Sequence, residues 1–367
     1  MSGSTRIGTF CATAVVATIL QLGILVAQES ADPLRAAFVK RIDEDKKAIG
    51  VLAALLTPEG KSFASYGRVS LDGPAPTQDT IFELGSIGKV FTSLLLADMV
   101  EKREVALDDP VKKYLPASVR VPSRGGREIT LRHLATHASG LPRDSVYVDL
   151  SGDISPYTGY APGDLYAFLG GYQLSREPGS QVEYSNVGMG LLGHALELRA
   201  GMSYEDLLRR RILEPLGMTN TGVTLSAEQD SRRATGHNPR LLPVPTWTGG
   251  VIAPAGGVSS TSADMLKFGA AVLDPKSPLK AAFARMTSVK IPLEERDSYQ
   301  VLGWGMFKYG GNDLLGHSGG TFGFETRLVV DTTRKRAVIV WVNGKAAGPV
   351  SDLVGLALER PRLSSSF

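Results

Sequence analysis

Residues 82–89 read FELGSIGK, and residues 90–100 continue as VFTSLLLADMV, a segment whose apolar residues recur at helical spacing. Ser86 and Lys89 are three positions apart, so on a helix they lie on the same face, about one turn from each other. A buried lysine loses its charge readily and can then take a proton from a hydroxyl group. The stretch fits a serine nucleophile and its activating lysine at the start of a helix, but it fits a chance pair equally well, and the rest of the chain has to decide between them.

Composition and charge narrow the class of protein. Hydrophobic residues make up 43% of the 367 residues and charged residues 21%, the balance of a globular protein with a large core. The net charge is only +3, and no long basic run concentrates it. We therefore expect no nucleic acid partner.

The N-terminal segment, residues 1–27, combines one positive charge, Arg6, with an almost wholly apolar run that ends at Ala27. This pattern predicts a secretory signal peptide, and hence a periplasmic or secreted protein. The alternative is an uncleaved N-terminal membrane anchor, because the run is long enough to span a bilayer. The only cysteine, Cys11, lies inside this run, so cleavage would leave no cysteine for disulfides, thiol catalysis or metal binding.

Strand-like segments lie at both ends of the remaining chain. Residues 50–68 read as two strands around a turn at Pro58-Glu59-Gly60, and WGMFKY, LLGHSG, ETRLVVD and AVIVWVN near the C-terminus are further strand candidates. Between residues 107 and 245, helical segments alternate with loops rich in proline and glycine. The pattern predicts an α/β (α+β) fold in which helices flank an antiparallel sheet built from both chain ends, with a mainly helical insert.

The expected organisation is a pair of lobes. Residues 28–106 and 246–367 would form the α/β lobe with the sheet, and residues 107–245 the mainly helical lobe. The active site is expected between them. Ser262 is expected to cap the helix that follows it.

A second candidate element is QVEYSNVGMG, which contains Tyr184 and, two residues later, Asn186. A tyrosine with a depressed pKa can take the proton of the serine, and a carboxamide can hold both lysine and substrate by hydrogen bonds. Taken alone, the pattern is better explained by a tyrosine that packs its ring in a turn and by a turn asparagine.

A third candidate element is LLGHSGGTFGFET, with His317, Ser318, Gly319 and Gly320. We expect these residues on an edge strand that lines a cleft. The glycines let a substrate backbone approach closely, and the N–H of Gly320 can join the N–H of Ser86 as an oxyanion hole. The alternative is a plain glycine-rich hairpin.

The three elements together are far more specific than any one of them. Ser-x-x-Lys, Tyr-x-Asn and His-Ser-Gly occur in the order of a known catalytic set, and the chain resembles the serine β-lactamase/penicillin-binding protein family of the class C type. The likeness extends over roughly residues 33–345 and includes LDDPVKKYLP, ITLRHLATHASGLPR, PGSQVEYSNVGMGLLG, ILEPLGMTNT and APAGGVSSTSADMLKF. It implies a β-lactamase/transpeptidase-like fold.

The resemblance assigns roles to the candidate residues. Ser86 is the nucleophile that becomes acylated, Lys89 and Tyr184 share the proton transfers with either one as the base, and Asn186 orients the substrate amide and Lys89. Ser318 lies beside the substrate carboxylate. No metal or organic cofactor is implied.

His317 departs from this family, which commonly has a lysine there. Lysine is cationic at pH 7, whereas histidine is mostly neutral, so the hold on a substrate carboxylate should be weaker and more dependent on pH. A histidine at this place resembles some DD-carboxypeptidases, D-aminopeptidases and esterases more than the efficient class C β-lactamases.

We therefore expect a serine hydrolase that acts through an acyl-enzyme on β-lactams, on D-Ala-D-Ala peptides of peptidoglycan, or on both, with no stable protein partner. The alternative is an esterase or D-aminopeptidase with the same site, and a less favoured one is an inactive peptidoglycan-binding module. His133 and His137 have the spacing of some metal sites, but no third ligand follows them. Trp247 and Tyr147 are candidates for the cleft wall or for ordinary packing.

Overall fold

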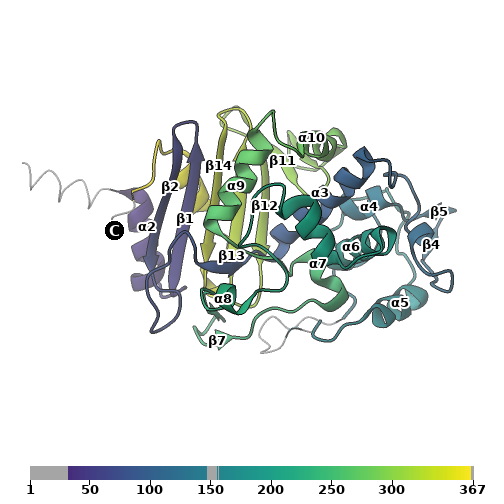
Figure 1. Ribbon diagram of the computed structural model, residues 1–367, viewed down its shortest axis with the longest axis horizontal. Helices are drawn as coiled ribbons and strands as arrows, with labels where there is room; N and C mark the ends of the chain where they lie inside the picture. The colour runs from purple at the N-terminus through teal and green to yellow at the C-terminus, as the bar shows by residue number, and fades with distance from the viewer. Residues whose placement is uncertain (1–31, 147–154, 156, 365–367) are drawn as a thin grey trace, which may run out of the picture.

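The computed structural model describes residues 32–146, 155 and 157–364. The expected signal peptide and Tyr147 lie outside these residues. An eight-stranded antiparallel sheet, in the order β2-β1-β14-β13-β12-β11-β10-β9, lies beside a mainly helical region (Figure 1). Because β1 and β2 come from the start of the chain and the others from its end, the predicted sheet built from both chain ends is confirmed.

The sheet contains, in chain order, β1 (Gly50–Thr57), β2 (Gly60–Gly67), β9 (Ile291–Pro292), β10 (Ser298–Gln300), β11 (Gly305–Tyr309), β12 (Asn312–Gly320), β13 (Glu325–Asp331) and β14 (Arg336–Val342). Three small antiparallel pairs are β3 (Ile81–Glu83) with β8 (Ser259–Thr261), β4 (Ser123–Arg124) with β5 (Arg127–Glu128), and β6 (Gly236–His237) with β7 (Pro243–Val244). The β3–β8 pair matters most for the site, since β3 leads directly to Ser86.

The α-helices are α2 (Pro33–Val39), α3 (Gly88–Glu101), α4 (Leu131–Ala135), α5 (Pro162–Gly171), α6 (Asn186–Ala200), α7 (Tyr204–Leu208), α8 (Ala227–Asp230), α9 (Ser262–Leu273), α10 (Lys280–Ser288) and α11 (Ser351–Leu358). Short 3₁₀ segments are η2 (Gly85–Ile87), η3 (Val111–Tyr114), η5 (Gly250–Ala255) and η6 (Lys345–Ala347), and π-helical turns are η1 (Lys40–Glu44) and η4 (Arg209–Leu213). The first helix, α2, therefore continues directly into the π-helical turn η1.

Helices cover both faces of the sheet. Alternate residues of β1 belong to different cores: Leu52 packs in the cluster that includes α9 and α3, whereas Val51 packs in the cluster with α2 and α11. A strand covered on both faces needs apolar residues at successive positions, which is why residues 50–56 read GVLAALL.

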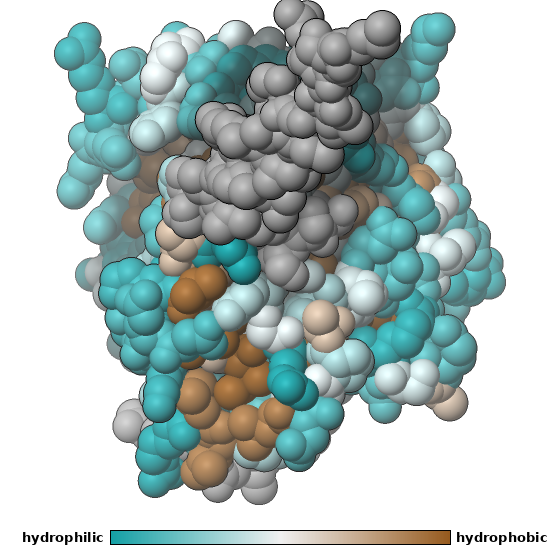
Figure 2. Space-filling view, turned by 90° about the vertical axis from the view of Figure 1, so that its left-hand side faces the viewer, coloured by the Kyte–Doolittle hydropathy of each residue, from teal (hydrophilic) through white to brown (hydrophobic). Residues whose placement is uncertain are grey.

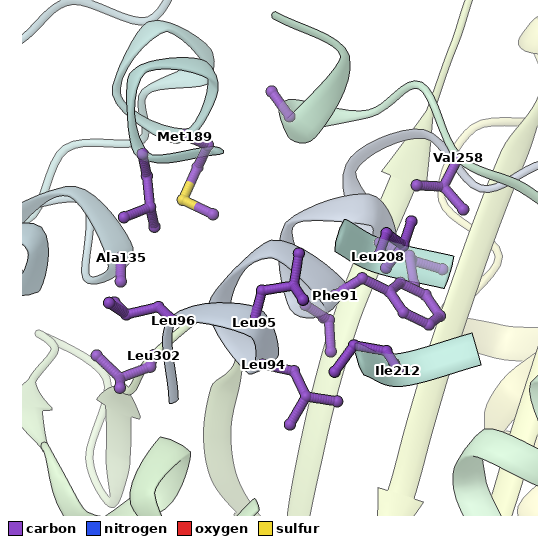
Figure 3. Packing of buried hydrophobic residues seen from close by; sticks show 14 of the residues in the cluster. Phe91, Leu94, Leu95, Leu96, Ala135, Met189, Leu208, Ile212, Val258 and Leu302 are labelled. Carbon is purple, nitrogen blue, oxygen red and sulfur yellow. The ribbon is translucent and has the colours of Figure 1, made fainter. Parts of the chain in front are cut away.

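The helix that follows Ser86, α3, is the centre of the larger core. Its residues from Gly88 to Met99 are all buried, as expected for a helix with apolar side chains on all of its sides. Figure 3 shows side chains from several elements around it. Those labelled there are Phe91, Leu94, Leu95 and Leu96 of α3, with Ala135, Met189, Leu208, Ile212, Val258 and Leu302.

Two local expectations are wrong. The strand with His317 is not an edge strand, because β11, β10 and β9 follow β12 in the sheet. The register of β11 with β12 nevertheless ends at Gly305↔Gly316, so residues 317–320 extend beyond β11. The cap of α9 is Thr261, whose side chain accepts a hydrogen bond from the Asp264 N–H, while Ser262 is the first helical residue.

The outer surface is polar over most of one side. Seen from the side of α2 and β2, it is mainly hydrophilic, with one hydrophobic patch below the centre (Figure 2). Over the described part of the chain, no helix combines the length and the apolar character that crossing a bilayer requires.

Candidate active site

Ser86 lies in the tight turn that joins β3 to α3. Gly85 has a φ of +52°, and a Cβ atom at this position would stand 2.7 Å from the Gly320 nitrogen. Only glycine fits both the left-handed backbone and this close approach. One turn later, the Nζ of Lys89 lies 3.1 Å from the Oγ of Ser86, so the contact expected from the three-residue spacing is formed.

Lys89 is fully buried and forms no ion pair with the described residues. Its second hydrogen bond goes to the Ala255 carbonyl, at 2.6 Å. Burial, with the nearby charge of Arg143, holds the pKa of Lys89 well below its usual value, although Asp144 acts in the opposite direction. The amine can therefore be neutral near pH 7 and accept a proton from Ser86.

Tyr184 stands next to this pair with a neutral phenol. The Lys89 Nζ lies 4.7 Å from the centre of its ring, and the His137 ring centre lies 4.5 Å away. Burial raises the pKa of Tyr184 to about 12, and the hydrogen bond from Ser86 and the charge of Arg143 offset only part of that effect. The expectation of a depressed tyrosine pKa is wrong, because desolvation outweighs the neighbouring cations.

Asn186, the first residue of α6, is held by a carboxylate that the sequence analysis did not single out. Its Nδ2 donates to the Oδ1 of Asp144 at 2.8 Å, and the Tyr157 hydroxyl donates to the same oxygen at 2.7 Å. The implied contact of Asn186 with Lys89 is not among the hydrogen bonds of the described residues. Asp144 therefore fixes the orientation of the carboxamide.

His317 is half-buried near the end of β12. Its Nδ1 lies 2.6 Å from the Ser318 carbonyl, and because a carbonyl only accepts, Nδ1 carries the proton. Burial, together with the charge of Lys89, lowers the pKa of His317 to about 4. At pH 7 the ring is thus neutral, and its Nε2 has a free lone pair.

The other residues of the third element have distinct neighbours. Ser318 is exposed, and its Oγ accepts a hydrogen bond from Arg327 at 2.9 Å. A Cβ atom on Gly319 would overlap the Leu84 carbonyl, so this glycine lets β12 pack against the turn before Ser86. A Cβ atom on Gly320 would stand 3.0 Å from the Nζ of Lys345.

These residues surround one cleft of about 900 Å³. Its wall contains Ser86, Tyr184, Asn186, His317, Ser318, Gly319 and Gly320, and Lys89 lies buried behind Ser86. The predicted site residues therefore come together. Trp247, considered from the sequence, also lines the cleft.

Four charged residues of the cleft wall form pairs. Arg143 Nε lies 3.7 Å from the Oδ2 of Asp144, and Lys345 Nζ lies 2.5 Å from the Oε1 of Glu325. Asp144, Glu325 and Lys345 were missed, because their contacts join segments far apart in sequence. The one usable signal was that Arg143 and Asp144 directly follow the Ser-Gly-Leu-Pro segment.

The side chains of His133 and His137 accept hydrogen bonds from two different backbone segments. The Nδ1 of His133 accepts from the Thr130 N–H, and the Nδ1 of His137 accepts from the Ser185 N–H, each at 3.2 Å. Over the described residues, no three histidine, cysteine, aspartate or glutamate side chains group as metal ligands. His137 thus supports the segment that carries Tyr184 and Asn186.

Comparison with known proteins identifies the family of the chain. The beta-lactamase family model matches residues 35–358. The chain belongs to the beta-lactamase family. Its similarity to the class C beta-lactamase of Rhodobacter sphaeroides has a TM-score of 0.74 at 27% identity, over 89% of this chain and 100% of that one. For the beta-lactamase/D-alanine carboxypeptidase of Yersinia pestis, the TM-score is 0.74 at 26% identity, and the match covers 89% of this chain and 98% of that one.

Curated relatives of this beta-lactamase family member have two kinds of name. The D-alanyl-D-alanine-carboxypeptidase/endopeptidase AmpH of Escherichia coli is 32% identical over 60% of this chain, and the match spans only 56% of AmpH. A beta-lactamase of Yersinia enterocolitica is 29% identical over 78% of this chain and 72% of that protein. The family is therefore established, while the names of these relatives divide between beta-lactamase and D-alanyl-D-alanine-carboxypeptidase/endopeptidase.

Proposed function

We propose that this protein is a serine hydrolase that acts through an acyl-enzyme on Ser86. The observation that carries the proposal is the position of the Ser86 Oγ, 3.1 Å from the amine of a fully buried lysine that forms no ion pair with the described residues. A hydroxyl group becomes a useful nucleophile only when a base takes its proton.

Lys89 is the base in this proposal, and Tyr184 is the acid. The neutral amine of Lys89 takes the Ser86 proton while Oγ attacks the substrate carbonyl. Tyr184, a phenol with a pKa of about 12, keeps its proton at pH 7 and can donate it to the leaving group. The proton on Lys89 then restores the phenol, so one proton has passed from the nucleophile to the leaving group.

The backbone N–H groups of Ser86 and Gly320 would hold the negative charge that develops on the carbonyl oxygen. This arrangement depends on β12 lying against the turn of Ser86, and the close approach at Gly85 and Gly319 supports it. Donors placed in advance typically contribute about 10²- to 10³-fold each to the rate. Water would then attack the acyl-enzyme and release Ser86.

The proposed substrates are β-lactams, D-Ala-D-Ala peptides of peptidoglycan, or both, as small molecules in the cleft between the two proposed lobes. The names of the relatives support these classes. A second candidate function, an esterase or D-aminopeptidase, is favoured by the neutral His317. The proposed location is the periplasm or the exterior, reached through residues 1–27, with N-terminal anchoring as the alternative.

Intact-mass spectrometry during incubation with penicillin tests the proposal, with Ser86→Ala as the control. A persistent adduct on the wild type alone would indicate a DD-peptidase that penicillin traps. A transient adduct with accumulating penicilloic acid would indicate a β-lactamase. If no adduct forms but small p-nitrophenyl esters are hydrolysed in a Ser86-dependent way, the esterase function gains support. If neither substrate requires Ser86, the proposal is wrong.

A further inference from the structure

Glu83 carries a buried carboxyl group close to the catalytic turn. It is the last residue of β3, three positions before Ser86, and it is only 6% exposed. Glu83 forms no ion pair with any described residue. Burial raises its pKa, and its two hydrogen bonds and the charge of Arg233 offset this effect only in part. Because a carboxyl group is costly to bury unless hydrogen bonds compensate, the partners of Glu83 indicate what it does.

The two hydrogen-bond partners of Glu83 belong to different segments of the cleft wall. The Trp247 N–H donates to the Oε1 of Glu83 at 2.8 Å, and the side chain of Thr321 forms a hydrogen bond with the same carboxyl group. Trp247 and Thr321 both line the cleft. Glu83 can therefore act on the cleft through these two neighbours without contacting a substrate itself.

Thr321 begins the turn of residues 321–324, which directly follows Gly320. Its N–H donates to the Phe324 carbonyl at 3.0 Å, and its Oγ1 accepts from the Gly323 N–H at 3.4 Å. The hydroxyl group of Thr321 thus shapes its own turn and at the same time connects that turn to Glu83.

The turn of residues 321–324 is held at both ends by consecutive residues. Glu83 binds Thr321 at its start, and the Leu84 carbonyl accepts from the Thr326 hydroxyl, just beyond its end, at 3.0 Å. Leu84 is followed by Gly85 and Ser86. The position of this turn relative to the nucleophile is therefore set by side chains on both sides.

We propose that Glu83 is a positioning residue for the oxyanion hole: its hydrogen bond with Thr321 keeps the adjacent Gly320 N–H where negative charge develops on the substrate oxygen. This inference rests on the proposed function and adds to it a residue that acts through another. Donors of this kind act in the transition state, and displacement by a few tenths of an ångström weakens them. Because removing one donor typically costs about 10²- to 10³-fold, displacing one should cost about tenfold.

Two esters test the inference. They are p-nitrophenyl acetate and p-nitrophenyl thionoacetate, which differ only in the oxygen or sulfur atom of the reacting C=O or C=S group. Sulfur is a weak acceptor of hydrogen bonds, so a well-placed oxyanion hole favours the oxygen ester. In Glu83→Gln, where one acceptor oxygen replaces two, the oxygen-to-sulfur ratio of kcat/KM should fall about tenfold from the wild-type value. An unchanged ratio would overturn the inference.

The variants of Thr321 show whether the effect passes through this residue. Thr321→Val should lower the ratio as Glu83→Gln does, and Thr321→Ser, which keeps the hydroxyl group, should retain the wild-type ratio. The double variant Glu83→Gln/Thr321→Val should be no worse than either single variant, because both changes break one contact; additive losses would overturn the inference. Glu294→Gln is the matched control on an exposed side chain and should keep the wild-type ratio.

Both esters are measured on one preparation, so a loss of folded protein cancels in the ratio. Hydrogen–deuterium exchange of residues 319–326 then separates this inference from the proposed function. Exchange at least about fivefold faster in Glu83→Gln than in the wild type supports it, and equal exchange overturns it. Faster exchange with an unchanged ester ratio also overturns it, because Glu83 would then only stabilise the turn. If neither ester is hydrolysed in a Ser86-dependent way, the hydrolase proposal fails on these substrates, while exchange still decides whether Glu83 holds the turn.

Discussion

Replacing Lys89 by methionine should greatly slow the acylation of Ser86 and stabilise the protein. Holding a lysine neutral at pH 7 costs roughly 4–5 kcal/mol relative to water, because the free side chain has a pKa of about 10.4. Methionine has a similar length and no charge to desolvate. The substitution removes the contacts with Ser86 and Ala255, worth about 1 kcal/mol each. We expect a net gain of about 2 kcal/mol in the free energy of unfolding at pH 7.

The stability difference between Lys89→Met and the wild type should depend on pH. Between the lowered pKa of Lys89 and about 10.4, the unfolded wild type binds one proton more than the folded form, so its stability rises by about 1.4 kcal/mol per pH unit. The Lys89→Met variant lacks this term. Its advantage should therefore shrink as the pH rises, vanish between about pH 8 and 9, and reverse near pH 10, where the lost hydrogen bonds dominate.

Urea denaturation of both proteins from pH 7 to 10 measures this difference, and the rate of Ser86 acylation by penicillin should fall about 10²- to 10⁴-fold in the variant. Lys280→Met is the control, since Lys280 is exposed on α10 and surface changes usually stay within about 0.5 kcal/mol. A stability difference that does not vary with pH would mean that folded Lys89 keeps its proton. That result would refute its role as the base.

Two further predictions concern β12. His317 has a pKa of about 4 and is neutral at pH 5–9, so His317→Lys should place a cation in the third element over this range. We expect kcat/KM for carboxylate substrates to rise about tenfold. An unchanged pH–rate profile would contradict this prediction. Gly319→Ala should lower the free energy of unfolding by about 1–3 kcal/mol, because its Cβ would overlap the Leu84 carbonyl and the Thr326 hydroxyl. Gly170→Ala is the control: no described atom lies within 4 Å of its Cβ position, and thermal unfolding of both variants tests the contrast.

Local spacing was enough to predict much of the fold and part of the site. The three-residue interval between Ser86 and Lys89 gave their contact, and alternating or continuous apolar runs gave β1 and the strands from β11 to β14. Both signals depend only on helix and strand periodicity. Short polar strands such as β10 (Ser298–Gln300) carry little of this signal, which explains why β12 was wrongly expected at the edge.

The missed features depend on tertiary packing. The pKa of Tyr184 is raised by burial, and the residues around Tyr184 in the sequence do not show how deeply its side chain is buried. The Arg327–Ser318 contact requires the register of β12 with β13. The hydrogen bond between Asn186 and Asp144 joins the start of a helix to a loop 42 residues earlier. No local pattern fixes such contacts.

The pairing of β1 with β14 has a consequence for biosynthesis. β1 pairs with β14 through contacts such as Val51↔Val342, and at the outer ends of the chain Asp32 forms an ion pair with Arg360. During translation, the β1–β2 hairpin is synthesised early, and β1 cannot pair with β14 until nearly the whole polypeptide has been made. Such distant pairing slows folding and leaves apolar strand edges exposed. A chain of this design therefore stays open for a long interval during synthesis, and in that state it is vulnerable to aggregation.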